Sequence, residues 1–369
     1  MPARWKRSSD PPGIPTESRA AKGGTRFVDS KMDSRTRTRI LILIVFGTLI
    51  LGGASPLLVL AGSSNAPGGI AMIDFHATEA GLKDHLKVLT KDIGERSVRF
   101  PARLQRTAGY VLEFYRGIGA EARLEPYRYQ GFEVANVVAE IAFSPHPAQR
   151  ILIGAHYDSV AGTVGADDNA SAVAVQLETA RQLMGLKSTR EMDLSVVFVS
   201  FALEEPPAYG TPYMGSRVYA RKARERQERI DGMICLEMVG YTCREPGCQG
   251  YPFPLMFFGY PKQGDFIGIV GNFDSLGWTR RIYDAFRRNP DLPVIKLTVP
   301  FNGWILPAVR LSDHASFWDE GYTAVMVTDS AFYRNPHYHR ATDTMETLDT
   351  RFMAELVKSL VGFLCTAGR

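Results

Sequence analysis

Short apolar runs along the chain alternate with longer segments in which apolar residues recur with helical periodicity. The runs are typical of buried strands, and the periodic segments are typical of helices packed on one face. The expected strands cover 134–142, 150–155, 194–202, 232–239, 255–258 and 323–328. The expected helices cover 77–93, 102–118, 170–186, 213–228, 274–288 and 350–364. Strands that alternate with helices predict a layered α/β fold with helices on both faces of a sheet.

The N-terminal part of the chain does not continue this pattern. Residues 1–39 hold ten Lys and Arg against four acids, and their Pro, Gly, Ser and charge content is typical of disorder. Residues 40–61 contain no charge, and a segment of 22 such residues is long enough to cross a bilayer. Residues 62–74 are expected to form a linker, and residues 75–369 a globular domain.

The basic residues before the apolar segment predict its orientation. The positive-inside rule makes residues 1–39 a cytoplasmic tail and residues 40–61 a transmembrane signal anchor, with the catalytic domain periplasmic or extracellular. A cleaved signal peptide is the alternative, with a cut after Ala61 and translation from Met32. The tail carries the whole excess of basic over acidic residues in the chain. The globular part therefore has no positive net charge that would indicate binding to nucleic acid.

The chain has four cysteines. Cys243 and Cys248 lie five positions apart in the turn-like stretch TCREPGCQG, and in an oxidising compartment they could close a small disulfide loop. Cys235 and Cys365 stand among apolar residues and are expected to be buried. No CxxC pair indicates a thiolate zinc site.

Candidate chemistry is concentrated in five segments with acidic or histidine residues. They are GAHYDS (154–159), GADDNAS (165–171), ALEEP (202–206), CLEMVG (235–240) and NPHYHRATDT (335–344). Three of the segments lie at or near the ends of expected strands, where ligands gather in α/β folds. A hydrolase with two metal ions needs this inventory: a shared ligand, further ligands for each ion, and a free carboxylate that acts on water.

The first two segments have ordinary explanations when each is taken alone. His156 and Asp158 share a face in extended geometry, and a strand-end histidine with a capping aspartate is their plain explanation. In the functional one, Asp158 either orients a metal-bound imidazole or tunes the metals from the loop. Asp167 and Asp168 precede a helix, where N-capping is the plain explanation and a bridging carboxylate the functional one.

The other segments are harder to explain without a cation. Glu204 and Glu205 are adjacent at a buried strand end, where two carboxylates repel each other. This suggests that one of them is a metal ligand and the other a free general base. Glu237 interrupts an apolar run and needs a metal or a buried Arg as its partner. Of His337 and His339 only one need face the site, and His314 in SDHASFW is a further candidate.

Together, the motifs HYDS, GADDNAS, EE and SDH, with a closing H-x-x-x-D-T, resemble the M28 family of co-catalytic zinc peptidases, which includes secreted bacterial aminopeptidases. The resemblance covers about 75–365 and implies a three-layer α/β/α fold with a mixed, mostly parallel sheet. It also implies two zinc ions and a peptide or small amide as substrate.

The resemblance implies a role for each matching residue. His156, Asp168 and Glu237 would hold one zinc, and Asp168, Glu205 and His339 the other. Glu204 would be the general base, and Asp158 would orient His156. His337 and His314 would lie behind the ligands or in the pocket, while Phe317, Trp318 and Trp304 are candidates for an apolar pocket, with core packing the plainer explanation.

Two positions depart from the family pattern. Glu237 stands where Asp is frequent, which keeps a carboxylate but lengthens its reach. No Tyr occurs in PAVRLSDH (307–314), where some members carry one that steadies the oxyanion, so Tyr241 and Tyr338 are the candidates for that task.

Four other functions are compatible with this kind of fold. A carboxypeptidase of this kind usually carries inserted domains, for which this chain has little room. A glutaminyl cyclase uses one zinc, and its counterpart of GADDNAS lacks the pattern found here. A small-molecule amidohydrolase would share the metal chemistry and differ only in its pocket. An inactive binding protein would have lost ligands or the catalytic Glu, whereas this chain keeps all of these positions.

Overall fold

The computed structural model of the chain describes residues 73–368. The expected tail, the expected membrane segment and nearly all of the expected linker lie outside this part. Between residues 73 and 368, no helix is both long enough and apolar enough to cross a membrane.

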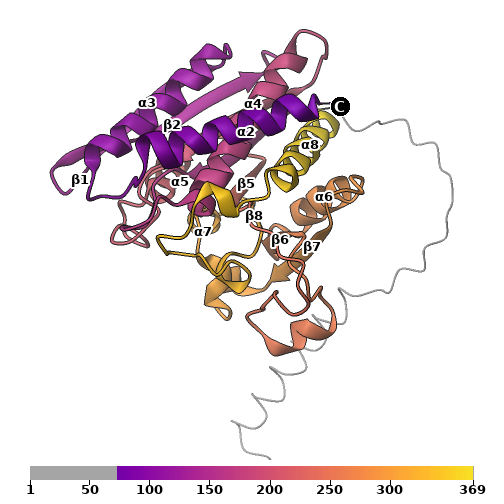
Figure 1. Cartoon of the computed structure of the whole chain (residues 1–369). Coiled ribbons are helices and arrows are strands. Elements are labelled where there is room, and N and C mark those ends of the chain that lie inside the picture. The colour runs from indigo at the N-terminus through magenta and orange to yellow at the C-terminus, as the bar shows by residue number, and fades with distance from the viewer. Residues whose placement is uncertain (1–72, 369) are drawn as a thin grey trace, which may run out of the picture. The chain divides into compact units, whose positions relative to one another are not determined.

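The described chain forms one α/β unit built on an eight-stranded sheet (Figure 1). The order of strands across the sheet is β1-β2-β4-β3-β5-β8-β6-β7. The strands are β1 (Glu121–Tyr129), β2 (Phe132–Ala142), β3 (Gln149–His156), β4 (Leu194–Phe201), β5 (Gly232–Glu237), β6 (Ile267–Asn272), β7 (Val294–Val299) and β8 (Ala324–Thr328). Four of the seven pairings are parallel, so the mixed, mostly parallel sheet is confirmed.

Helices cover both faces of this sheet, because alternate strand residues point to opposite sides and both sides are apolar. Ile151 and Ile153 of β3 belong to one hydrophobic core, and Leu152 between them belongs to the other. The larger core packs against α2 (Phe75–Lys87), α3 (Pro101–Gly117), α4 (Ala172–Lys187), α6 (Leu276–Phe286) and α8 (Thr350–Ala367). The smaller core packs against α5 (Gly215–Glu225) and α7 (His314–Asp319).

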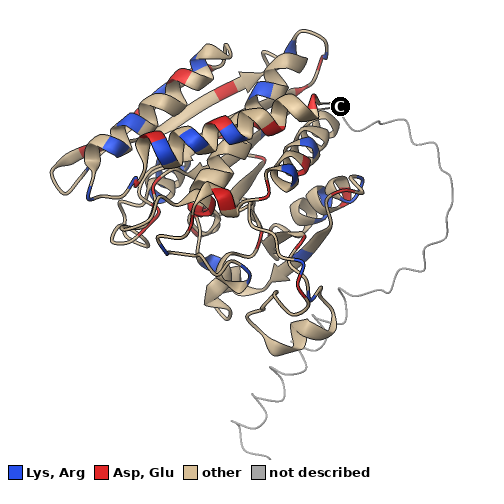
Figure 2. Ribbon diagram, in the orientation of Figure 1, with Lys and Arg blue, Asp and Glu red and all other residues tan. Residues whose placement is uncertain are grey.

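All six expected helices are present, and five of the six expected strands. The exception is 255–258, where the structure has a short 3-10 helix, η3 (Pro254–Phe258). The prediction of a strand there was wrong because Pro252 and Pro254 cannot donate ladder hydrogen bonds, while proline suits the first turn of a helix. On the outer helices, charges of both signs are mixed along α2 and α3 (Figure 2).

Three strands, β1, β6 and β7, are missing from the prediction for physical reasons. Strands β1 and β7 are the two edges of the sheet, and both leave much of their length partly exposed, so neither is a continuous apolar run. Strand β6 (IGIVGN) is buried, but its two glycines weaken the strand signal.

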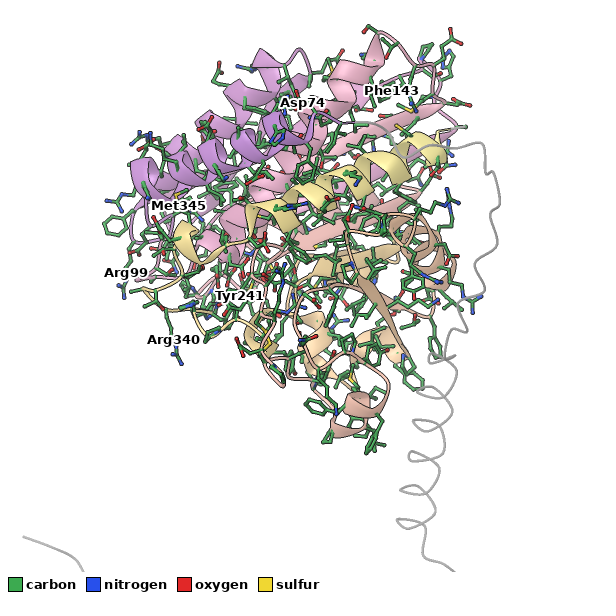
Figure 3. All side chains as sticks on the ribbon, turned by 45° about the vertical axis from the view of Figure 1, so that its right-hand side comes forward. Asp74, Arg99, Phe143, Tyr241, Arg340 and Met345 are labelled. Carbon is green, nitrogen blue, oxygen red and sulfur yellow. A yellow bond between two sulfur atoms is a disulfide. The ribbon has the colours of Figure 1, made fainter. Side chains whose placement is uncertain are left out.

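The central strands β4, β3, β5 and β8 run parallel, so their carboxyl ends meet at one edge of the sheet. His156 is the last residue of β3 and Glu237 the last of β5, while Glu204 follows β4 by three positions. The fold therefore brings together segments that are far apart along the chain. Arg340, within the last of the five segments, lies at the side of the molecule away from Phe143, and Tyr241, directly after the fourth segment, lies between them (Figure 3).

Candidate metal centre

Two groups of side chains at the carboxyl end of the sheet have the composition of metal sites. His156, Asp168 and Glu237 form one group, and Asp168, Glu205 and His339 form the other. Within each group the potential ligand atoms all lie within 4.8 Å of one another. The structure thus brings together all five residues expected to be ligands.

Asp168 belongs to both groups and turns one oxygen toward each. Its Oδ1 lies 3.4 Å from Nε2 of His156, and its Oδ2 lies 3.2 Å from Nε2 of His339. Nε2 of His156 is also 3.5 Å from Oε2 of Glu237, and Nε2 of His339 is 3.4 Å from Oε2 of Glu205. A carboxylate placed in this way suits a bridge between two cations.

Asp158 lies behind His156 and joins two strand ends. Its Oδ1 is 3.3 Å from Nδ1 of His156, a contact rather than a well-aligned hydrogen bond. The same carboxylate accepts the backbone N–H groups of Glu204 and Glu205, each at 3.0 Å. Of the two roles open for Asp158, this position favours orientation of the imidazole, and it also fixes the Glu-Glu pair.

The segment that carries Asp168 is held by a carboxylate from far along the chain. Asp168 lies in the helical turn η2 (Ala166–Ser171), whose first N–H groups need acceptors. Asp343 supplies them: its Oδ1 accepts N–H of Asp167 at 2.9 Å, and its Oδ2 accepts N–H of Asp168 at 3.2 Å. Asp343 stands in the D-T pair of the last segment, but nothing local in the sequence predicts this contact.

Asp167 turns away from the two groups. Its carboxylate accepts N–H of Gly240 at 2.9 Å and the side-chain amide of Asn335 at 2.7 Å. Asn335 in turn accepts N–H of His337 at 2.8 Å. Asp167 therefore connects the start of the loop that carries His339 to the residues after β5. This role differs from the helix N-cap that is its plain explanation.

Glu237 is positioned by two neighbours that stand in the SDH and GADDNAS motifs but for which the sequence predicts no role. Ser312 donates its hydroxyl to Oε2 of Glu237 at 2.7 Å. Asn169 donates its amide to the carbonyl of Leu236 and accepts N–H of Met238, so it holds the backbone on both sides of Glu237. Since Asn169 follows Asp168 directly, one residue links the shared ligand to the end of β5.

Burial and mutual repulsion shift the pKa values of several acids in the two groups and beside them. Burial and the charge of Asp168 raise the pKa of Glu205 to about 8. Burial also raises the pKa values of Glu204 and Glu237. Burial alone would lower the pKa of His339, but its contacts with Asp168 and Glu205 raise it to about 10.

The donor set fits a divalent cation. Burial opposes a charge on His156, yet the charges of Glu237 and Glu204 raise its pKa well above the usual value. Its Nε2 and Oε1 of Glu205 are buried and have no hydrogen-bond partner in the described part of the chain. Buried polar atoms without partners are rare, and nitrogen and carboxylate ligands of this kind suit zinc.

The two remaining candidate histidines lie outside both groups. His314 is fully buried, its Nε2 lies 2.8 Å from the carbonyl oxygen of Val309, and burial lowers its pKa to about 3. Its ring meets Trp318 edge-on at 4.5 Å, as in core packing. Nδ1 of His337 lies 2.9 Å from the hydroxyl of Thr342.

The two tyrosine candidates differ in their surroundings. The ring of Tyr338 stacks on His339, with centroids 3.8 Å apart. Tyr241 turns its ring edge-on to His337, and its backbone N–H is bound by Asp329. Tyr338 is therefore the one in direct contact with a residue of the two groups.

An apolar cavity of about 110 Å³ opens beside Glu237. Its walls come from the loop 250–260, from β6 and β7, and from Tyr338. Phe317, Trp318 and Trp304 do not line it: the first two are buried in the smaller core, and Trp304 is exposed beside Arg310. The cysteines Cys243 and Cys248 form a disulfide in the segment that leads to this loop.

Known proteins share this sequence and fold. The family model "Peptidase family M28" matches residues 136–254. The uncharacterized protein YfbL of Escherichia coli (strain K12) is 37% identical over 297 residues, which cover 78% of this chain and 88% of that protein. The chain belongs to peptidase family M28. A probable leucine aminopeptidase of Arthroderma otae is 26% identical over 66% of this chain and 59% of its own length.

Solved structures of bacterial enzymes show the same fold. The LapA aminopeptidase of Legionella pneumophila superposes with a TM-score of 0.59 at 19% identity, covering 83% of this chain and 78% of that one. A glutaminyl cyclase of Porphyromonas gingivalis superposes with a TM-score of 0.57 at 15% identity, covering 80% and 98%. Because both activities occur on this fold, the fold alone does not choose between them.

Zinc is expected to raise the thermal unfolding midpoint of metal-free full-length protein. A ligand that binds only the native state stabilises it by about 4 kcal/mol at a thousandfold excess over Kd. Differential scanning calorimetry with zinc would measure this shift, with magnesium as the control because it prefers sites made of oxygen ligands alone. An unchanged midpoint in zinc would contradict a zinc centre.

Proposed function

We propose that this M28 peptidase is an aminopeptidase with two zinc ions, which removes N-terminal residues from peptides. The observation that carries the proposal is the pair of ligand groups that share Asp168, with Glu204 beside them. His156, Asp168 and Glu237 would hold one ion, and Asp168, Glu205 and His339 the other. Zinc in such a site acts as a Lewis acid that activates water and polarises a carbonyl group.

Glu204 is placed to move the protons of this reaction. Its carboxylate is buried, lies 3.9 Å from Nε2 of His156 at the closest, and makes no hydrogen bond within the described residues. Its backbone is fixed through Asp158, whereas its side chain is free to accept a proton. Glu204 would take a proton from the attacking water and return it to the leaving amine.

The apolar cavity beside Glu237 supports a substrate with a large apolar N-terminal side chain. The hydroxyls of Tyr251 and Tyr260 are bound to the carbonyls of Pro261 and Lys296. These two residues therefore offer ring surfaces rather than free hydroxyls to the cavity. A leucine-like side chain in this position would place its amide beside the ligand groups.

Two other reactions are compatible with the same fold. A cyclase would need only one metal, so the second group of Asp168, Glu205 and His339 favours hydrolysis. An amidohydrolase acting on small molecules would use the same residues and differ in what fills the cavity. An inactive binding protein is disfavoured because both groups and Glu204 are complete.

We also propose that residues 40–61 anchor the enzyme in a membrane, with the catalytic domain outside the cytoplasm. The support is the uncharged sequence and the basic residues before it. Full-length protein made in cells is expected to stay with the membrane fraction after extraction at alkaline pH. Release of a shortened chain that begins after Ala61 would instead favour signal cleavage.

Zinc-loaded full-length protein is expected to cleave leucyl anilide and to leave N-acetyl-leucyl anilide intact. Glu204→Gln should lower turnover by roughly 10²–10⁴-fold, because it removes general-base catalysis. Its zinc content, measured by atomic absorption, should stay at two per chain because Glu204 is not among the ligands. Full activity in this variant would sink the general-base role, and cleavage of neither anilide would point to cyclase or amidohydrolase substrates.

Gly268→Leu is expected to fill the cavity. Gly268 lines it from β6, and an added Cβ would meet its nearest neighbour, the carbonyl oxygen of Thr328, at an ordinary 3.5 Å. The ratio of kcat/KM for leucyl over alanyl anilide should fall on the order of 10–100-fold, since a pocket discriminates by the volume it offers. Gly277→Leu, at a helix glycine with open space around it, is the matched control. An unchanged ratio in Gly268→Leu would show that substrates bind elsewhere.

A further inference from the structure

A fully buried arginine lies behind the metal centre. Arg96 comes from the segment between α2 and α3, and its side chain has no exposed surface. No carboxylate within the described chain forms an ion pair with it. Instead, its guanidinium donates to backbone carbonyls throughout: Tyr157 at 2.7 Å, Val164 at 2.6 Å, Gly165 at 2.9 Å, Leu89 at 3.1 Å and Gly94 at 3.2 Å.

Three of these five carbonyls belong to the loop that joins the first two ligand segments. Tyr157 stands directly after His156, and Gly165 stands three positions before Asp168. One planar guanidinium therefore donates hydrogen bonds to both ends of the loop 157–165. The backbone N–H of Arg96 also donates to the hydroxyl of Ser159 at 3.0 Å, and that hydroxyl donates to the carbonyl of Thr163 at 3.1 Å.

The same residue brings a positive charge close to the buried acids. Burial lowers the pKa of Arg96 to about 10, and the charges of Asp158, Asp343 and Asp168 oppose that fall. Arg96 is therefore a cation at neutral pH. Its charge is fixed in place by hydrogen bonds to neutral carbonyls, which leaves the carboxylates free for other partners.

We propose that Arg96 is a positioning residue that sets the separation between His156 and Asp168, and thereby the zinc affinity of the centre. This inference rests on the proposed metal centre. It assigns to Arg96 no contact with zinc or with substrate, because the hydrogen bonds of its guanidinium all go to backbone carbonyls. Residues that orient metal ligands in this indirect way commonly change metal affinity 10–100-fold when altered.

The test is Arg96→Lys in the full-length chain. Lysine keeps the charge, but its single ammonium group cannot span both ends of the loop. Zinc affinity, measured on metal-free protein by competition with a chelator, is expected to weaken by about tenfold or more. The absorption spectrum of the cobalt-substituted protein should change as well, because it reports ligand geometry. A loss of packing away from the ligands would leave the cobalt spectrum unchanged.

Arg334→Lys is the matched control. Arg334 is also buried, but it donates to the carbonyls of Tyr241 and Phe266 and to the side chain of Gln249, and Phe266 lines the cavity. This variant is expected to keep wild-type zinc affinity and to raise KM for leucyl anilide. An equal loss of zinc affinity in both variants would overturn a specific role for Arg96.

The outcomes separate this inference from the proposed function. In one outcome, the wild type binds zinc while Arg96→Lys shows the same zinc affinity and the same cobalt spectrum. That result would overturn only the role of Arg96. A wild type that binds no zinc would overturn the metal centre itself. If Arg96→Lys does not fold, Ser159→Ala decides, because it loosens the same loop and keeps the guanidinium. Unchanged zinc affinity in that variant would overturn the proposal.

Discussion

The structure depends on the burial of acidic side chains at one edge of a sheet. Nine carboxylates around the carboxyl ends of β3, β4, β5 and β8 are buried: Asp158, Asp167, Asp168, Glu204, Glu205, Glu237, Asp313, Asp329 and Asp343. So many negative charges away from water repel one another and lose hydration, so each needs a compensating partner. The neighbouring loops are arranged to provide those partners.

Six of these nine acids divide into two kinds by the partners they use. Asp158, Asp167 and Asp343 accept backbone N–H groups and so connect segments that are distant in sequence. Asp168, Glu205 and Glu237 face the two imidazoles instead. The division explains why adjacent acids behave differently: Asp167 holds the scaffold, whereas Asp168 faces both ligand groups.

The sequence predicts the interior of this fold well and its margins poorly. Continuous apolar runs revealed the buried strands β2, β3, β4, β5 and β8, because strands covered on both faces have that composition. The same criterion misses the half-exposed edge strands β1 and β7. At the site, Glu204, Glu205 and Glu237 were informative because acids in or directly after buried strands are hard to explain without a partner of opposite charge.

The supporting contacts could not be predicted, because they join backbone atoms to side chains far along the chain. Arg96 reaches carbonyls more than sixty positions away, and Asp343 reaches N–H groups more than 170 positions away. Neither residue stands in a local pattern that indicates its target. The geometry of the proposed ligands is thus fixed by residues whose role only the folded chain reveals.

The unequal exposure of the two imidazoles has a consequence for the lifetime of bound metal. The His156 side chain is fully buried, whereas that of His339 is 31% exposed and belongs to a loop. Solvent and chelators therefore reach the half of the centre near His339 first. A centre built in this way would exchange its two ions at different rates, with an inner ion retained through purification and an outer ion that equilibrates with the surrounding medium.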